Sequence, residues 1–203
     1  MSIVEVPSPI DLRLMSDALE WERNAMGRPF REDFFETITN ELRKQGEPEL
    51  TVLELGSGPG FLAAYIMKKL PLVRMQLLDF SSAMHSLARR RLAVYADRVT
   101  FIERDFKESN WTTGLGSFDA VVTLQAVHEL RHKSYAEEFH GQVRGLLKAR
   151  GRYLVCDHYF GEDGMKNDQL YMTLDEQRTS LERAGYNVKD LLIKGGRALY
   201  HAA

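Results

Sequence analysis

Three glycines lie close together in the stretch Thr51–Gly60, which reads Thr-Val-Leu-Glu-Leu-Gly-Ser-Gly-Pro-Gly. Gly56, Gly58 and Gly60 tolerate a positive φ and carry no Cβ, so a polar ligand can approach the backbone here. An apolar run precedes the glycines, and a segment with helical spacing follows from Phe61. The unpaired N–H groups at the start of that helix would face a ligand in the turn.

The spacing of the glycines separates two kinds of nucleotide ligand. Dinucleotide-binding turns read Gly-x-Gly-x-x-Gly, and the third glycine lets the helix pack closely on the strand. In this chain the third position is occupied by Phe61. The strand itself contains an acid, Glu54, two residues before Gly56. A carboxylate at that place suits a ligand with an ammonium group better than a ligand with a pyrophosphate.

A second acid follows the next predicted strand. Residues 74–80 end in Asp79 and Phe80, and Ser81 then opens a helix. Asp79 follows Gly60 by 19 residues, an interval that places an acid beside a bound ribose. A carboxylate accepts hydrogen bonds from both ribose hydroxyls, which explains the residue type. The alternative is that Asp79 only caps the helix.

A third strand, predicted from Val99, is followed by Asp105 and Phe106. Together with the glycine turn, these strand ends resemble the motifs of class I S-adenosylmethionine (SAM)-dependent methyltransferases over residues 50–203. In that family the third strand end faces the adenine, where an acid accepts a hydrogen bond from the exocyclic amine and an apolar side chain covers the ring. Asp105 and Phe106 match this pattern, and an ordinary turn at a strand end is the alternative.

The resemblance implies that the chain binds SAM and releases S-adenosylhomocysteine (SAH). It also implies that the cofactor is contacted by the glycine turn and by the ends of the following strands. The cofactor-binding residues expected on this basis are Glu54, Gly56, Ser57, Gly58, Gly60, Asp79, Phe80, Met84, Asp105, Phe106 and Gln125. In metal-dependent catechol-type enzymes the position of Gln125 holds a magnesium-binding Asp, so no metal is predicted.

The alternation of predicted strands and helices after the glycine turn indicates an α/β fold with a parallel sheet. The expected fourth and fifth strands cover residues 118–124 and 152–157. Between them we predict a helix that opens with a capping box of Ser134 and Glu137 and stops at Gly151.

The C-terminal part predicts a second capping box and then a hairpin. Thr173 and Glu176 precede a helix, and two short strands are joined through Gly195 and Gly196. We therefore expect a Rossmann-like fold, with a mostly parallel seven-stranded sheet and helices on both faces. An antiparallel hairpin strand should complete the sheet at the C-terminus, and a helical cap should precede it at the N-terminus.

We expect one domain, 1–203, in which residues 1–48 form a helical lid and residues 49–203 the SAM-binding core. The two helices predicted in the lid carry the aromatic residues Trp21, Phe30, Phe34 and Phe35. An apolar lid over a core without large insertions indicates a small organic acceptor, methylated at O, N or C. Aromatic residues at helical spacing also fit a plain hydrophobic core, so both interpretations stay open.

Two histidines follow strands whose carboxyl ends meet at the ligand-binding edge of an open α/β sheet. His128 comes after the fourth predicted strand, and Asp157 and His158 follow the fifth. Methyl transfer from a sulfonium is an in-line displacement that depends on the positions of two reactants. If the acceptor is a hydroxyl or a protonated amine, a neutral imidazole can remove its proton. His128 and His158 are the candidate bases and Asp157 the candidate orienting group; hydrogen bonding within the loops is the alternative.

His128 also starts the pentapeptide His-Glu-Leu-Arg-His, a literal match to the zinc motif His-Glu-x-x-His. That motif needs both histidines on one face of an α-helix, with the Glu as general base. Here the preceding strand ends at Leu124 and the next predicted helix starts at Ser134, so the pentapeptide falls largely in a loop. A zinc hydrolase stays as one alternative, and a non-catalytic SAM-binding partner kept for regulation or assembly is another.

The composition narrows the class of protein. The 203 residues, 44% of them apolar and 28% charged, are typical of a globular chain and suffice for one domain that buries about 70% of its unfolded surface. A net charge of −2 indicates neither a nucleic-acid nor an anionic-membrane partner. No apolar run has the length of a membrane span, Met1–Glu5 does not begin a signal peptide, and the single Cys156 fits a reducing compartment. We therefore expect a cytoplasmic location, and the oligomeric state is left open.

Overall fold

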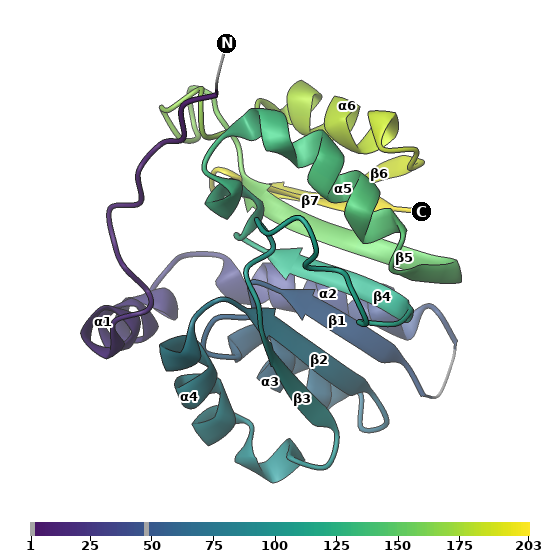
Figure 1. Cartoon of the computed structure of the whole chain (residues 1–203). Coiled ribbons are helices and arrows are strands. Elements are labelled where there is room, and N and C mark those ends of the chain that lie inside the picture. Colours follow the sequence, from purple (N-terminus) through teal and green to yellow (C-terminus); the bar gives the residue numbers. More distant parts are fainter. Residues whose placement is uncertain (1–2, 47–48) are drawn as a thin grey trace.

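Strands and helices alternate along most of the chain in the computed structural model, which describes residues 3–46 and 49–203 (Figure 1). Within these residues the strands are β1 (Thr51–Leu55), β2 (Arg74–Asp79), β3 (Val99–Glu103), β4 (Phe118–Leu124), β5 (Leu147–His158), β6 (Val188–Lys194) and β7 (Arg197–Ala202). The helices are α1 (Met15–Ala25), α2 (Arg31–Arg43), α3 (Phe61–Lys69), α4 (Ser82–Arg91), α5 (Ala136–Arg144) and α6 (Leu174–Arg183), with short 3₁₀ turns η1 (Ala93–Tyr95), η2 (Val127–Leu130) and η3 (Lys133–Tyr135).

The seven strands form one sheet in the order β3-β2-β1-β4-β5-β7-β6. Strands β1 to β5 pair in parallel, and β7 pairs antiparallel with both β5 and β6. The turn between β6 and β7 consists of Gly195 and Gly196, whose φ values of 56° and 72° are the positive values that a two-residue hairpin turn of this kind requires. The predicted fold class is therefore confirmed.

Helices cover both faces of the sheet because both faces of its central strands are apolar. One core contains Ile38 of α2 and Ile66 of α3, and the other contains Phe139 of α5. In β1, Val52 belongs to the first core and Leu53 to the second, which is the alternation of a strand buried on both sides. In Figure 1, α5 and α6 lie on one side of the sheet and α2 and α3 on the other.

The parallel strands bring the predicted site residues to one edge of the sheet. Leu55, at the end of β1, pairs with Leu78 of β2 and with Thr123 of β4. The glycine turn, Asp79 and the segment after β4 therefore begin side by side. This arrangement follows from the parallel pairing, because parallel strands end at the same edge.

The predicted start of the helix between the fourth and fifth strands is wrong. Ser134 and Glu137 do not form a capping box; α5 begins two residues later than expected and has no side-chain cap. The Ser134 hydroxyl lies instead 2.8 Å from Nδ1 of His132, and the same ring nitrogen accepts a hydrogen bond from the Ser134 backbone N–H. The neighbouring imidazole has thus taken the place of the expected glutamate.

The predicted end of that helix, at Gly151, is also wrong. The helix α5 ends at Arg144, and β5 starts at Leu147. Gly151 lies inside β5, where the register with β4 shifts. A Cβ at Gly151 would lie 2.9 Å from the carbonyl oxygen of Phe118. This glycine therefore allows β5 to bend against β4 and does not end a helix. The second predicted capping box is confirmed: Thr173 and Glu176 hydrogen-bond each other's backbone N–H at the start of α6.

The N-terminal helices do not act alike. The rings of Phe34 and Phe35 in α2 are buried in the core under the sheet, which is the alternative that the sequence left open for them. Phe30 is 44% exposed and precedes α2. The helix α1 packs instead on α4, through Ala18 and Met84 among other residues. The predicted boundary between lid and core falls at residues 47–48, which lie outside the described residues, as do Met1 and Ser2.

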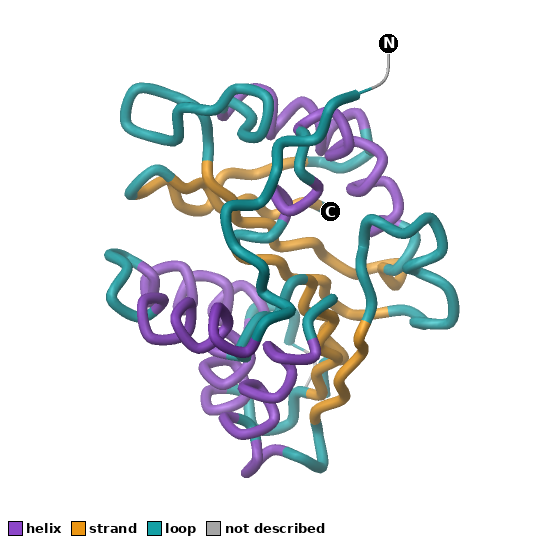
Figure 2. Tube along the Cα trace, turned by 60° about the vertical axis from the view of Figure 1, so that its left-hand side comes forward, coloured by secondary structure: helices purple, strands orange, loops and turns teal. Residues whose placement is uncertain are grey.

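Residues 3–14, which we call the N-terminal strap, run from the side of α5 and α6 to α1 (Figures 1 and 2). Arg131 holds the strap: its Nε donates to the carbonyl oxygen of Val6 at 2.8 Å and its Nη2 to that of Pro7 at 2.7 Å. At the far end, the Ser81 hydroxyl donates to the carbonyl of Leu12. The strap thus crosses the sheet edge at which the predicted site residues lie. None of the helices in residues 3–46 and 49–203 has the length and hydropathy of a membrane span.

Candidate functional site

A cavity of about 310 Å³ opens at the carboxyl edge of the sheet, within the range usual for small-molecule sites. Its wall comes from the glycine turn, the ends of β2, β4 and β5, the N-terminal strap and α1. The predicted residues that line it are Gly56, Gly58, Asp79, Phe80, Met84, Phe106, Gln125, His128 and His158. Five predicted residues do not line it: Glu54, Ser57, Gly60, Asp105 and Asp157.

The three glycines of the turn have different tasks, although all have positive φ values. A Cβ on Gly58 would meet no atom within 4 Å, so this glycine keeps space open beside the cavity. A Cβ on Gly56 would lie 2.4 Å from the Cβ of Ala126, so this glycine is needed for packing. Gly60 caps α3, and its missing side chain leaves room for Leu92. Of the three glycines, only Gly58 is therefore explained by the need to leave space for a ligand.

Glu54 is buried behind the turn, with 3% of its surface exposed. Its Oε2 atom has no hydrogen-bond partner among the described residues, and neither does the buried hydroxyl of Ser57. Burial raises the pKa of Glu54 to about 8, against the opposing charge of Arg31. The backbone N–H of Ala63 also acts against this rise in the pKa of Glu54. A buried carboxyl oxygen without a donor is unfavourable, so Oε2 fits a ligand that brings a positively charged donor.

Asp79 lies between the glycine turn and α4. Its Oδ2 accepts the N–H of Gly58 at 2.8 Å, and its Oδ1 accepts the N–H of Ser81 at 2.9 Å. Burial raises the pKa of Asp79 to about 6, although both N–H groups oppose the shift. The cap of α4 is the Ser81 hydroxyl, which accepts from the N–H of Met84 at 3.0 Å. Each oxygen of Asp79 therefore keeps a lone pair for a ligand in the cavity.

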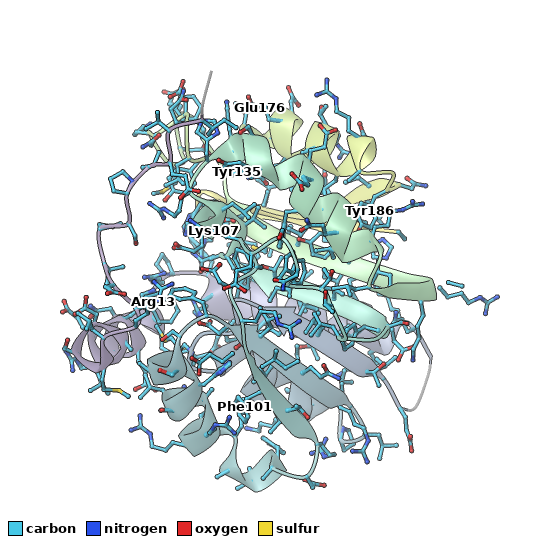
Figure 3. The ribbon with its side chains drawn as sticks, in the orientation of Figure 1. Arg13, Phe101, Lys107, Tyr135, Glu176 and Tyr186 are labelled. Carbon is cyan, nitrogen blue, oxygen red and sulfur yellow. The ribbon has the colours of Figure 1, made fainter. Side chains whose placement is uncertain are left out.

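The structure separates the two residues after β3. Phe106 lines the cavity, as expected for a residue that covers a ring. Asp105 turns away: its Oδ1 accepts the N–H of Lys107 at 2.9 Å, and its Oδ2 lies 3.7 Å from Nη2 of Arg13. Arg13 and Lys107, labelled in Figure 3, come from the strap and from the segment after β3. In this conformation Asp105 makes the turn at a strand end that the sequence left as the alternative.

His128 and Asp157 form a tight pair at the floor of the site. Nδ1 of His128 lies 2.7 Å from Oδ1 of Asp157, whose Oδ2 accepts the backbone N–H of His128 at 2.8 Å. On its other side, Nε2 of His128 lies 3.4 Å from Oε1 of Glu129. Burial lowers the pKa of His128, but the two carboxylates outweigh it and raise this pKa to about 10. The imidazole is therefore protonated between two acids.

His158 has the opposite character. Its Nε2 lies 2.6 Å from Nε2 of Gln125, so the imidazole accepts and Gln125 donates. Burial lowers the pKa of His158 to about 4, although Asp157 raises it. Gln125 is held at a φ of 60°, and its Oε1 accepts from Nη1 of Arg31 at 3.1 Å. His158 is thus a neutral imidazole whose acceptor nitrogen is already occupied.

Apart from Trp21, six further residues line the cavity without having been predicted to bind cofactor or catalyse. They are Leu12, Arg28, Leu124, Ala126, Glu129 and Tyr171. Glu129 was visible in the sequence only as part of the zinc pentapeptide, and Arg28 lies in the connection between two helices. No local spacing marks Arg28, because the fold brings it to the cavity from a remote part of the chain, and Glu129 directly follows the predicted His128. Trp21 of α1, an expected lid residue, also lines the cavity.

The zinc pentapeptide does not have the geometry of a zinc motif. Residues Val127–Leu130 form the 3₁₀ turn η2, and Arg131 has a left-handed backbone with φ of 66°. His132 therefore leaves the site, and its Nε2 lies 3.2 Å from Oε1 of Gln169. Across the parts of the chain that the structure describes, no three His, Cys, Asp or Glu side chains are grouped as metal ligands. The predicted loop at this position is confirmed.

The site fits SAM by its donors and acceptors. The unpaired Oε2 of Glu54 suits an ammonium group, the free lone pairs of Asp79 suit a ribose, and Phe106 offers a ring to a base. The open space beside Gly58 leaves room for the ligand between these groups.

Comparisons with known proteins agree with this fit. Residues 52–151 match the family described as "Methyltransferase domain". Lovastatin diketide synthase lovF of Aspergillus terreus (strain NIH 2624 / FGSC A1156) is 28% identical over 152 residues, which are 71% of this chain and 6% of that protein. Malonyl-(acyl-carrier protein) O-methyltransferase of Priestia megaterium (strain DSM 319 / IMG 1521) is 38% identical over 60 residues, 30% of this chain and 21% of that protein.

A solved structure described as the DhpI-SAH complex has the same fold. It superimposes with a TM-score of 0.71 and 21% identity, covering 94% of this chain and 95% of that one. The fold, the glycine turn with its two acids, and the matched family point to one conclusion. The chain belongs to the class I S-adenosylmethionine-dependent methyltransferases.

Proposed function

We propose that this protein transfers a methyl group from SAM to a small organic acceptor, at an O, N or C atom, and releases SAH. The observation that carries the proposal is the unpaired Oε2 of Glu54, buried behind the open turn at Gly58, while Gly58 and Asp79 line the cavity itself. An ammonium group and a ribose are the two polar parts of SAM that need acids. The proposal therefore rests on one acid for each of these two parts.

Each residue of the site is assigned to one part of the cofactor. Glu54 accepts from the ammonium group, Asp79 from the ribose hydroxyls, and the apolar side chains of Phe80, Met84 and Phe106 cover the adenine. Gly58 leaves the backbone bare where the ligand passes. Asp105 reaches the adenine only if its contact with Arg13 opens, so we assign it a smaller contribution to adenine binding.

We assign the removal of the acceptor's proton to the pair of His128 and Asp157. SAM supplies an electrophilic methyl group on a sulfonium. The positive charge of SAM in the cavity destabilises the imidazolium of His128. An acceptor that takes the place of Glu129 at Nε2 also removes one of the two carboxylates that stabilise this imidazolium. Both changes lower the pKa of His128. Nε2 can then take the proton of an O–H or N–H acceptor while the bond from oxygen or nitrogen to the methyl carbon forms and the sulfur–carbon bond breaks.

Asp157 and His158 have positioning roles in this scheme. Asp157 holds Nδ1–H of His128 and stabilises the imidazolium that forms, as the acid of a catalytic triad does. His158 and Gln125 hold each other through their Nε2 atoms. That contact fixes the wall between the cofactor and the acceptor, so His158 need not accept a proton.

The strap and α1 form the lid in this proposal. Leu12, Trp21 and Arg28 line the cavity from outside the sheet, so closure of the site depends on the strap, α1 and the connection after α1. The cavity of about 310 Å³ supports a small acceptor. One relative is named as an O-methyltransferase, which supports oxygen among the possible acceptor atoms.

The test of the function is the formation of SAH from SAM with a panel of small hydroxyl, amine and carboxylate compounds. Acceptor-dependent SAH formation supports the enzyme. Binding of SAM and SAH with no turnover of any compound would favour the non-catalytic partner instead. Zinc-dependent hydrolysis without binding of either nucleoside would favour the hydrolase.

Asp79→Ala is expected to weaken SAH binding by roughly 1.5–3 kcal/mol, because a carboxylate that accepts from the ribose is lost. Titration calorimetry measures the change. Asp79 also holds two backbone N–H groups, so the thermal unfolding midpoint is recorded alongside. Asp79→Asn keeps one acceptor oxygen, so its affinity for SAH should lie between those of the natural protein and Asp79→Ala. An unchanged affinity in the folded Ala variant would remove Asp79 from the ribose role.

Binding of SAH is expected to release a proton from Glu54 near neutral pH. The pKa of Glu54 is raised to about 8 in the ligand-free protein, so the carboxyl group is mostly protonated at lower pH. An ammonium ligand lowers that pKa, and affinity must therefore rise with pH up to about pH 8 and level off above it. Calorimetry in buffers of different ionisation enthalpy counts the protons.

The matched control for that experiment is Glu54→Gln, which keeps the shape and cannot ionise. It should lose the part of the proton release that belongs to Glu54 and the rise of affinity between about pH 6 and 8. Any release that persists in this variant belongs to His128 or Asp79, whose raised pKa values also fall when a cation binds. Identical proton release in the two proteins would contradict the assignment of Glu54 to the ammonium group.

A further inference from the structure

Arg28 brings to the cavity a positive charge that no acid of the described chain neutralises. It lies between α1 and α2, and its guanidinium carbon is 5.0 Å from the centre of the Trp21 ring. Within residues 3–46 and 49–203 it forms no ion pair and no side-chain hydrogen bond. A partly buried guanidinium with five donors and no acceptor favours an anionic ligand.

Two more arginines raise the positive charge at the same end of the cavity. Arg31 is 7% exposed, and its Nε has no partner among the described residues. Arg197 donates to backbone carbonyl oxygens, including that of Pro29. Burial and then the charge of Arg28 lower the pKa of Arg31 to about 10, so the guanidinium groups repel one another. Such a cluster is stabilised by a bound anion.

The two arginines nearest the site differ in their access to it, because Arg28 lines the cavity and Arg31 does not. Arg31 acts on Glu54 and donates to Gln125, so it lies with the acid that we assign to the amino-acid part of SAM. Arg28 acts on His158, where its charge adds to burial in lowering the pKa. The wall at that place continues through Tyr171, whose ring centre lies 6.0 Å from that of His158. Arg28 lines the cavity together with His158 and Tyr171, the wall that we assign to the acceptor.

We propose that Arg28 binds an anionic group on the methyl acceptor, so that the acceptor is a small organic anion. The inference rests on the proposed function and adds the class of substrate to it. A carboxylate, phosphate or phosphonate offers two oxygens to the planar guanidinium. Trp21 and Tyr171, which line the same cavity, supply aromatic surface for the body of the acceptor. The methionine carboxylate of SAM has the same chemistry, so the experiment must separate the two sources.

The cofactor arm compares SAH with 5′-methylthioadenosine, which lacks the amino-acid part. Calorimetry is run on the full-length protein, on Arg28→Gln and on the control Arg23→Gln, an exposed arginine of α1 outside the cavity. The affinity for SAH is expected to change by less than about threefold in Arg28→Gln. A loss of about tenfold or more for SAH, with 5′-methylthioadenosine unaffected, would give Arg28 to the cofactor and overturn the proposal.

The acceptor arm uses small hydroxy-carboxylates and hydroxy-phosphonates, each beside its neutral amide or ester. SAH formation is expected from anionic members only. Arg28→Gln should lower kcat/KM for them by about 10- to 100-fold, and Arg28→Lys should restore part of it. Arg23→Gln should match the natural protein. Equal turnover of neutral members, no turnover of any anionic member, or unchanged kcat/KM in Arg28→Gln would overturn the proposal.

The experiments distinguish a failure of the proposed function from a failure of the role of Arg28. If the natural protein binds neither SAH nor SAM, the proposed function fails. If it binds them and methylates neutral compounds as well as anions, only the role of Arg28 fails.

Discussion

Gly58→Val is expected to lower the affinity for SAH by at least about 100-fold, close to 3 kcal/mol, while the protein still folds. The structure leaves open space where a Cβ on Gly58 would lie, and that space is the proposed path of the ligand. A valine side chain would fill it. The affinity is measured by titration calorimetry, and the fold by circular dichroism and thermal unfolding.

The φ of 53° at Gly58 adds a second effect, because a β-branched residue is strained at positive φ by about 1–2 kcal/mol. Gly114 separates strain from obstruction. It has a φ of 74°, also has open space around a Cβ, and lies outside the cavity. Gly114→Val should therefore lose similar stability and keep its affinity for SAH. Equal affinity in Gly58→Val and the natural protein would show that no ligand passes this turn.

His128→Ala is expected to lower kcat by about 10²–10⁴-fold with an acceptor that must lose a proton. The affinity for SAH should stay within about threefold, because His128 lies on the acceptor side in our scheme. The pair with Asp157 supports the role, since Asp157 holds Nδ1 at 2.7 Å and His128 lines the cavity with Glu129 near its Nε2. Turnover is followed as SAH formation under saturating SAM.

The control for His128 is His132→Ala. His132 is the other histidine of the zinc pentapeptide, is bound to Ser134 and Gln169, and does not line the cavity. It should leave kcat unchanged. Loss of activity in both variants, together with loss of bound zinc, would instead support the hydrolase. Full activity of His128→Ala with a hydroxyl acceptor would return His128 to a structural role.

The strand ends of the fold were predictable because they depend on local patterns. The apolar run before Gly56 and the acid at Asp79 each end a parallel strand, and parallel strands share one edge. Gly195 and Gly196 marked the final hairpin for the same reason, since only a left-handed backbone makes that turn. These features are set within about ten residues of chain, so the sequence contains them.

The helix between β4 and β5 shows where local patterns fail. Ser134 and Glu137 have the spacing of a capping box, but His132 engages the Ser134 hydroxyl first. Gly151 has the place of a helix stop, but its missing Cβ serves the contact of β5 with Phe118. In both cases a neighbour outside the motif changes the outcome. The motif alone does not name that neighbour.

The residues of the candidate site also separate into those that local patterns predict and those that they do not. Residues at strand ends, such as Gly58 and Asp79, could be placed from the sequence. Arg28 and Glu129 could not, because they reach the cavity through the packing of the strap, α1 and η2. Asp105 is the converse case: its position follows the family pattern, but Lys107 and Arg13 hold its carboxylate. Contacts between remote segments decide such residues.

The most direct measurement is titration calorimetry of the purified protein with SAH, SAM and NAD. The account predicts one SAH or SAM per chain, bound with release of a proton near pH 7, and no heat with NAD. Heat with NAD and none with either sulfur nucleoside would contradict it, because Glu54 and Asp79 would then not be the acids of a SAM site.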